Sequence, residues 1–233
     1  MYFSIPIRSV VKVYQTEGLL SVIRRSFVFI GKKVFSYETY YLLEQSVQDL
    51  ELHHGKHVPV MPGSTTKLVT SNLQADELAR EYEDFRPYHI SAHQMLDAGA
   101  TVLCVYIGKE FANMGWFATT DSAKKTFNDI PYHVDFDNKE ACLGGSYTTP
   151  KYRRQGMRIY GNRFRNKALK ELGIVTRKMA VRTNNIIGLK ASNATPGHRV
   201  YARAHCIRFL AFTFWKEIPM GIPLQDIVGS KPD

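Results

Sequence analysis

The amino-acid sequence predicts a mixed α/β domain that is built on one central sheet. Strand-like apolar stretches alternate with helix-like stretches from residue 72 onward, which is typical of a sheet flanked by helices. The composition agrees with a folded domain, since 44% of the 233 residues are hydrophobic and 22% are charged. No internal repeat is visible, so residues 68–233 are expected to form one domain after a separate N-terminal region.

The N-terminal region, residues 1–47, is predicted to be an amphipathic helical appendage. Apolar residues recur at helical spacing on either side of Gly18, and basic residues supply the polar side of the second helix. Such a helix pair packs against its own domain, joins the subunits of a homodimer, or contacts an anionic membrane through residues 1–40. Residues 48–67 are predicted to be a linker, and its histidines (His53, His54 and His57) are expected to be solvated rather than bound to a metal.

The elements of the domain are expected in a definite order. Two helices come first, over 74–84 and 90–98, and a hairpin of strands over 101–107 and 110–119 follows across Gly108-Lys109. A polar connection over 120–137 leads to a strand over 140–148 and a long helix over 157–172. A strand over 177–183, a short helix over 186–193 and an antiparallel pair within 198–215 complete the domain.

The charge and the cysteines limit the classes of partner and compartment. The net charge of +10 suits nucleic acid, an anionic membrane or a phosphorylated cofactor. The three cysteines, Cys104, Cys142 and Cys206, lie in apolar strand-like stretches without metal-ligand spacing, which predicts buried reduced thiols. No apolar run approaches the ~18 residues that span a bilayer. We therefore expect a soluble cytoplasmic protein, with peripheral membrane contact as the open alternative.

The segment from residue 140 to residue 173 is the most informative part of the sequence. An apolar strand leads through a turn to Gly156, and a long helix with several cations follows. The first amides of a helix have no intrahelical acceptor and lie at the positive end of its dipole. A glycine at that point lets a phosphate approach the main chain, and Arg153, Arg154 and Arg158 add positive charge. The arrangement therefore predicts a site for a pyrophosphate.

This segment resembles the acyl-CoA-binding motif of the GCN5-related N-acetyltransferases, Gln/Arg-x-x-Gly-x-Gly/Ala. Residues 153–158 read Arg-Arg-Gln-Gly-Met-Arg, so Arg153 and Gly156 match the pattern, whereas Arg158 stands where Gly or Ala is usual. The resemblance covers about residues 68–218 and is most specific between 140 and 200. It implies a mixed, mostly antiparallel sheet flanked by helices, and an acetyl-CoA or other acyl-CoA as co-substrate, with no metal.

The resemblance also implies a mechanism and a set of cofactor contacts. The amine of a small-molecule or peptide acceptor would attack the thioester directly, in a gap where the sheet splays beside the motif strand. The pantetheine chain would pair with that strand, and the helix start would bind the pyrophosphate. The implied cofactor-binding residues are Leu143, Ser146, Tyr147, Thr148, Arg153, Arg154, Gln155, Gly156, Met157, Arg158, Asn184 and Asn185.

The proton-transfer residues are less defined by the sequence. Glu140 heads the motif strand and is the candidate base, with His133 and Tyr147 as alternatives, and a solvated strand-end carboxylate as the competing interpretation of Glu140. The tyrosine that many relatives use as general acid is absent, because Ser192 or Asn193 occupies its place.

Two other functions stay open beside N-acyl transfer. One is a non-catalytic acyl-CoA-binding or scaffold protein on the same fold. The other is a basic nucleic-acid-binding module, because cations follow one another along the helix over 157–172. No helix-turn-helix, zinc-finger or RNA-recognition signature accompanies those cations, so nucleic acid is not expected as a partner.

Overall fold

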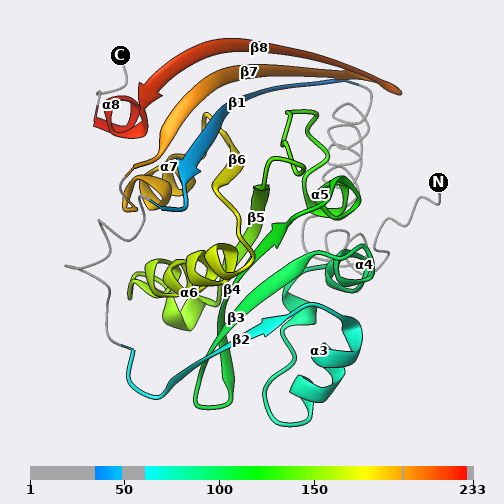
Figure 1. The fold of residues 1–233 in the computed structure, drawn as a ribbon, viewed down its shortest axis with the longest axis vertical. Helices are drawn as coiled ribbons and strands as arrows, with labels where there is room; N and C mark the ends of the chain where they lie inside the picture. The colour runs from blue at the N-terminus through cyan, green and yellow to red at the C-terminus, as the bar shows by residue number, and fades with distance from the viewer. Residues whose placement is uncertain (1–34, 49–60, 196, 230–233) are drawn as a thin grey trace, which may run out of the picture. The chain divides into compact units, whose positions relative to one another are not determined.

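The computed structural model describes residues 35–48, 61–195 and 197–229, and its strands form one sheet (Figure 1). The described strands lie in the order β2-β3-β4-β5-β6-β1-β7-β8. Their bounds are β1 Phe35–Ser46, β2 Ser64–Val69, β3 Thr101–Ile107, β4 Glu110–Ala118, β5 Glu140–Thr148, β6 Thr176–Arg182, β7 Arg199–Phe209 and β8 Phe212–Pro223. The pairings β2–β3, β3–β4, β4–β5 and β1–β6 are antiparallel, and β5–β6 is parallel. The predicted fold class, a mostly antiparallel mixed sheet flanked by helices, is confirmed.

The helices alternate with these strands along the chain. They are α3 Asn72–Ala79, α4 Ala92–Asp97, α5 Asp121–Phe127, α6 Met157–Glu171, α7 Ile186–Asn193 and α8 Leu224–Gly229, with 3-10 turns η1 Arg86–Tyr88 and η2 Pro150–Tyr152. In the part of the chain that the structure describes, no helix has the length and apolarity to cross a bilayer.

The chain divides into two compact units. The larger one comprises 40–203 and 218–229, and the smaller one contains 35–39 and 204–217 among the described residues. In the smaller unit the tip of the β7–β8 hairpin turns at Leu210, whose φ is +52°. The Tyr37 hydroxyl lies 2.6 Å from His205 Nδ1, and the two rings stack with centroids 5.9 Å apart.

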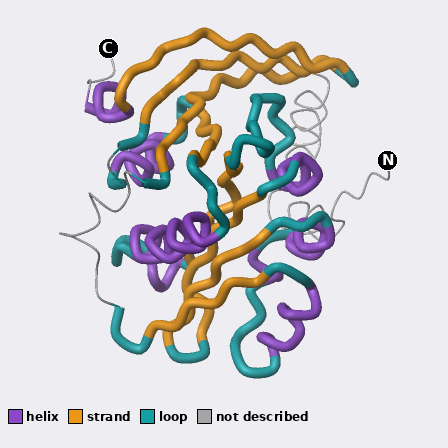
Figure 2. Tube along the Cα trace, in the orientation of Figure 1, coloured by secondary structure: helices purple, strands orange, loops and turns teal. Residues whose placement is uncertain are grey.

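Helices cover both faces of the sheet in the larger unit (Figure 2). On one face α6 packs against β3, β4 and β5, where Gly115 of β4 gives room to Arg165: a Cβ added at Gly115 would lie 2.5 Å from Arg165 Nη1. The next residue, Trp116, points to the opposite face because side chains alternate along a strand. There its ring packs 6.2 Å from that of Phe85, just before η1. The core between these layers includes Leu43, Phe117, Leu143 and Leu169.

Three sequence predictions need correction. The helical prediction for 1–47 is wrong over Phe35–Ser46, which form β1, because Tyr and Thr favour a strand there; residues 40–46 of this strand pair with β6. The linker predicted over 48–67 contains the first part of β2. The polar connection over 120–137 contains α5, whose N-cap Thr120 accepts from the amide of Ala123. The rest of the appendage and the three linker histidines lie outside the described residues.

Other boundaries shift by a few residues. The first helix of the domain ends at Ala79 rather than at residue 84, and the second begins at Ala92. The last antiparallel pair extends to Pro223 instead of ending at residue 215, and α8 follows it. The long helix and the short helix after β6 lie where the sequence predicts them. These differences leave the segment from β5 to α7 unchanged in its predicted order.

Candidate active site

The parallel strands β5 and β6 pair over only three residues and then separate. Their register begins at Glu140 opposite Thr176 and ends at Cys142 opposite Lys178. Beyond that point β5 continues beside β4 as far as Thr148, opposite Asn113. The main chain of β5 after Cys142 therefore has no described partner on its β6 side, and the splayed arrangement that the sequence resemblance implies is present.

A β-bulge in β5 accompanies this separation. Between the pairs Met114–Tyr147 and Trp116–Gly144, β5 contains one residue more than β4. Gly145 has a φ of +54°, a conformation that strains any residue with a Cβ. Asn113 fixes the strand beyond the bulge, because its Nδ2 donates to the carbonyl of Tyr147 at 2.7 Å. The bulge redirects β5 at the level where the gap opens.

The helix α6 begins with free main-chain amides. Gly156 is its N-cap residue, with a φ of +77° and no side-chain capping hydrogen bond. The first intrahelical bond in the described structure runs from the amide of Tyr160 to the carbonyl of Gly156, at 3.0 Å. No described residue accepts from the amides of Met157, Arg158 or Ile159. These donors are at the positive end of a helix of 15 residues and are suited to an anion.

The side chain of Arg158 turns away from the helix start. Its Nη2 lies 3.5 Å from Ser192 Oγ of α7, a long contact, and burial lowers the pKa of its guanidinium. Glycine or alanine is usual at this position in the resembled motif, because a side chain there can crowd the phosphate. Arg158 removes that difficulty by extending into the interior. Ser192 is one of the two positions where the family's tyrosine is missing.

The other predicted cofactor residues divide into two groups. The turn residues Arg153, Arg154 and Gln155 are exposed beside the helix start, where Arg153 Nε donates to the carbonyl of Thr148 at 3.1 Å. In β5, Ser146 is exposed and Tyr147 and Thr148 are half-buried, whereas the side chain of Leu143 belongs to the core.

The two asparagines predicted to contact the cofactor differ in their surroundings. Asn185 caps α7, because its Oδ1 accepts from the amide of Gly188 at 2.9 Å. Asn184 is exposed at the turn before it. Asn185 therefore serves as the N-cap of α7, whereas the side chain of Asn184 is accessible to a ligand.

The candidate base Glu140 lies at the closed end of the gap. Its Oε2 is 2.7 Å from Lys178 Nζ of β6 and also accepts from the amide of Asp135 at 2.7 Å. Seven residues of strand, about 23 Å of extended chain, separate it from Tyr147. The pair joins β5 to β6 where they are hydrogen-bonded, and the Glu140 side chain is only 16% exposed, so Glu140 is an ion-pair partner rather than the solvated carboxylate of the competing interpretation.

The two alternatives to Glu140 lie elsewhere. His133 is exposed on the wall of a cavity of about 510 Å³ formed by α5 and the loop after it. The ring of Tyr147 packs 5.5 Å from that of Tyr88, and no described residue hydrogen-bonds to its hydroxyl. Of the three predicted proton-transfer residues, Tyr147 alone lies on the part of β5 that has separated from β6.

Cys142 is a core thiol, as the sequence suggests. It is fully buried, its Sγ lies 3.0 Å from the Tyr132 hydroxyl, and burial raises its pKa to about 11. A nucleophilic cysteine needs a lowered pKa and access to the substrate. Cys142 has neither, so covalent catalysis through it is excluded by its surroundings.

Sequence reasoning missed that the cations of α6 fall into two classes. Arg163, Lys167 and Lys170 are exposed, but Arg165 is only 2% exposed and Arg158 also turns inward. The signal was in the spacing, because positions 158 and 165 are seven residues apart and share a helix face with Asn162 and Asn166. The cations of α6, which the sequence suggested as a phosphate-binding surface, therefore do not form one continuous face.

The chain is similar to known proteins in its fold. No family model and no curated protein matches the sequence. Solved structures that are similar to this chain include a GCN5-related N-acetyltransferase-like protein from Streptococcus suis, with 12% identity, a TM-score of 0.48, and coverage of 90% of this chain and 76% of that one. Several other similar structures are also GCN5-related N-acetyltransferases, with identities of 12–16%.

Two more of these structures cover a smaller share of their own chains. A GCN5-related glucosamine N-acetyltransferase region of a fungal multidomain β-N-acetylglucosaminidase is 13% identical, with a TM-score of 0.47 and coverage of 80% of this chain and 22% of that one. A Drosophila protein is 12% identical, with a TM-score of 0.46 and coverage of 82% and 58%. The chain thus spans less than two thirds of both.

Proposed function

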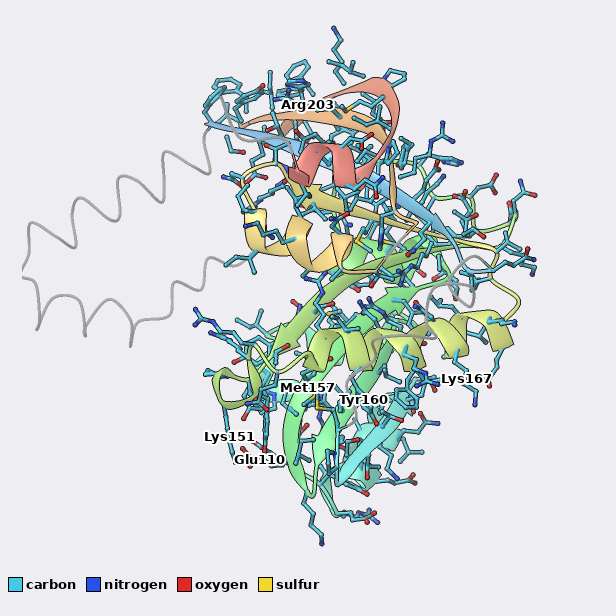
Figure 3. All side chains as sticks on the ribbon, turned by 90° about the vertical axis from the view of Figure 1, so that its left-hand side faces the viewer. Glu110, Lys151, Met157, Tyr160, Lys167 and Arg203 are labelled. Atoms are coloured by element: carbon cyan, nitrogen blue, oxygen red, sulfur yellow. The ribbon has the colours of Figure 1, made fainter. Side chains whose placement is uncertain are left out.

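We propose that this protein is an N-acyltransferase that uses acetyl-CoA or another acyl-CoA and acylates an amine by direct attack in a ternary complex. One observation carries the proposal: the amides of Met157, Arg158 and Ile159 have no described acceptor, and they come one short turn after a strand that separates from its neighbour (Figure 3 labels Met157 and Tyr160). The amides would hold the pyrophosphate, and the unpaired main chain of β5 would hydrogen-bond to the pantetheine.

The proposed reaction needs no covalent intermediate on the protein. The nitrogen of the acceptor forms a bond to the thioester carbonyl carbon, the carbon–sulfur bond breaks, and the amine proton leaves to a base or to water. The departing thiolate needs a positive or protic group in place of the absent tyrosine. Arg158, with the Ser192 hydroxyl 3.5 Å from its Nη2, is the group that we assign to this task. A guanidinium stabilises the thiolate by its charge and keeps its own proton.

The first experiment measures cofactor binding by thermal shift with acetyl-CoA and CoA, since a ligand that binds only the folded state raises its melting temperature. Gly156→Val should abolish the shift, because a β-branched residue is strained at positive φ and obstructs the helix start. Gly173→Val is the matched control. Gly173 lies just past the other end of α6, with a φ of +72° and open space around it, so its replacement imposes comparable strain far from the proposed phosphate site.

The outcomes separate the competing functions. A shift lost in Gly156→Val and kept in Gly173→Val supports the proposed site, and a shift that survives in both would place the cofactor elsewhere. Release of free thiol from acetyl-CoA in the presence of an amine panel then distinguishes an enzyme from a non-catalytic acyl-CoA-binding protein. Binding of nucleic acid without any effect of acyl-CoA would favour the basic-module alternative.

A further inference from the structure

The larger unit contains three neighbouring arginines, two of them buried and Arg158 half-buried, that have no acidic partner among the described residues. Arg158 and Arg165 come from one face of α6, and Arg177 comes from the neighbouring strand β6. Arg165 and Arg177 are 2% and 1% exposed. Among the described residues, no carboxylate forms an ion pair with any of the three. Burial of an unpaired charge is costly, so such a cluster requires a compensating group.

The three guanidiniums differ in how well neutral groups satisfy them. Arg177 is well bonded, since its Nε donates to Gln45 Oε1 at 2.8 Å and its Nη1 donates to Asn166 Oδ1 at 2.5 Å. Arg165 has one good bond, from Nη2 to Asn162 Oδ1 at 2.7 Å. Its Nη1 makes only long contacts, and its buried Nε has no partner, like the buried Nε of Arg158. The unsatisfied donors therefore belong to Arg165 and Arg158.

A buried histidine beside the cluster remains uncharged. His198 is 6% exposed and its Nδ1 lies 3.0 Å from the carbonyl of Thr195, so Nδ1 carries the hydrogen and Nε2 is a free acceptor without a described partner. Burial first, and then the charge of Arg177, lower the pKa of His198 to about 3. His198 also lines a cavity of about 510 Å³ between α7 and the start of β7. The histidine therefore adds no charge to the cluster, and its buried Nε2 has no described hydrogen-bond partner.

The cluster reaches the gap in the sheet through Arg165. Its Nη1 lies 3.3 Å from the carbonyl of Trp116 and 3.5 Å from Ser146 Oγ, and Ser146 is exposed on the bulged part of β5. Arg165 therefore lies next to an exposed residue of the bulged part of β5, with two donors, Nε and Nη1, that the described residues use incompletely. Oxyanions form short charge-assisted hydrogen bonds with such a group, which would repay the cost of burying it.

We infer that Arg165, in the neighbourhood of Arg158, forms a buried site for a small oxyanion, and that this oxyanion is a carboxylate or phosphoryl group of the acyl acceptor. The site thereby selects an anionic amine, such as an amino acid or a phosphorylated amino compound. The assignment to the acceptor rests on the proposed function, whereas binding of an oxyanion does not. Arg177 positions α6 against β6 and is not part of the ligand contact.

The test titrates the full chain with inorganic phosphate and with acetate, against sodium chloride at equal ionic strength, and follows melting temperature and heat of binding. Wild type should bind phosphate or acetate in preference to chloride. Arg165→Met removes the charge but keeps an apolar side chain of similar length, and should weaken binding about tenfold or more. Lys167→Met is the matched control, because Lys167 lies on the same helix with a side chain that is 73% exposed (labelled in Figure 3). It should bind like wild type.

The outcomes are decisive even if a variant fails to fold. Measurements on the wild-type protein are sufficient. If neither oxyanion binds better than chloride, the site is refuted; if binding shifts the ring signals of His198 in an NMR spectrum, the site is supported. If Arg165→Met and Lys167→Met weaken oxyanion binding equally, the effect arises from net charge and the proposal is wrong. If CoA displaces the bound oxyanion, the site belongs to the cofactor and the acceptor assignment is wrong. If oxyanion and CoA bind at the same time, the acceptor assignment is supported. If CoA does not bind at all, only the proposed function is refuted.

Discussion

The protonation state of His198 makes stability depend on pH in a way that can be measured. In the folded protein its pKa is lowered to about 3, first by burial and then by Arg177, while an ordinary histidine titrates near 6.5. Between these two values the unfolded chain binds a proton that the folded chain does not bind. Stability therefore falls as the pH is lowered through about 6.5, and would stop falling only near 3. Above pH 7 both states are neutral and the effect vanishes.

The magnitude follows from the shift in pKa. At pH 5 the unfolded histidine is about 1.5 pH units below its own pKa, and each unit corresponds to about 1.4 kcal/mol, so the loss from pH 7 to pH 5 is about 2 kcal/mol. The side chain is 6% exposed, so solvent screening reduces this little. His198→Asn removes the titration and keeps a donor near Nδ1, which hydrogen-bonds to the carbonyl of Thr195 at 3.0 Å.

The assay is urea denaturation of wild type and His198→Asn at pH 7 and at pH 5, in buffers without phosphate or a carboxylate. Titrating acidic groups affect both proteins in the same way and cancel in the comparison. Wild type should lose about 2 kcal/mol more than the variant between the two pH values. Equal losses would show that His198 is protonated as easily in the folded chain as in the unfolded one. That result would contradict the burial of an uncharged His198 beside Arg177.

Two further predictions follow from the strands around the gap. Gly145→Ala should lower the free energy of unfolding by about 1–3 kcal/mol in urea denaturation, because φ is +54° and the new Cβ would lie 2.8 Å from Cδ1 of the buried Trp116; a loss below about 0.5 kcal/mol would contradict the bulge. Cys104 and Cys142 should resist iodoacetamide at pH 8 in the folded protein and react in urea, since burial raises the pKa of both thiols. Mass spectrometry of the alkylated protein checks this, and rapid labelling of either residue without urea would refute it.

The central part of the fold could be predicted from local sequence. The run Thr101–Ile107 is apolar, β-branched or aromatic almost throughout, and Gly108 supplies the turn before β4. The long helix α6 follows directly on a glycine with positive φ, as the motif requires. In these segments propensity, hydrophobic period and turn chemistry agree, so that tertiary contacts only reinforce the local preference.

The parts that the sequence did not reveal depend on long-range contacts. β1 becomes a strand of the central sheet because Tyr40 lies opposite Arg182, more than a hundred residues away, and nothing local specifies that partner. Similarly, charge suggested that the arginines of α6 face solvent. Arg165 is buried because Gly115 on β4 leaves space for its guanidinium, and Asn162 accepts from it. Neither feature can be read from a window of neighbouring residues.

The two departures from the family motif are one feature in space. Arg158 replaces a small residue at the helix start, and Ser192 is one of the two positions at which the family's tyrosine would be expected, yet Arg158 Nη2 and Ser192 Oγ lie 3.5 Å apart. A tyrosine at position 192 would compete with the Arg158 guanidinium for the space beside α7, because Arg158 Nη2 already lies at the Ser192 hydroxyl. A small residue on α7 therefore permits a long cation on α6, and that cation leaves the amides accessible. The small residue at position 192 and the long cation at position 158 therefore suit one another, and under the proposed function Arg158 would supply a fixed positive charge in place of the family's proton donor.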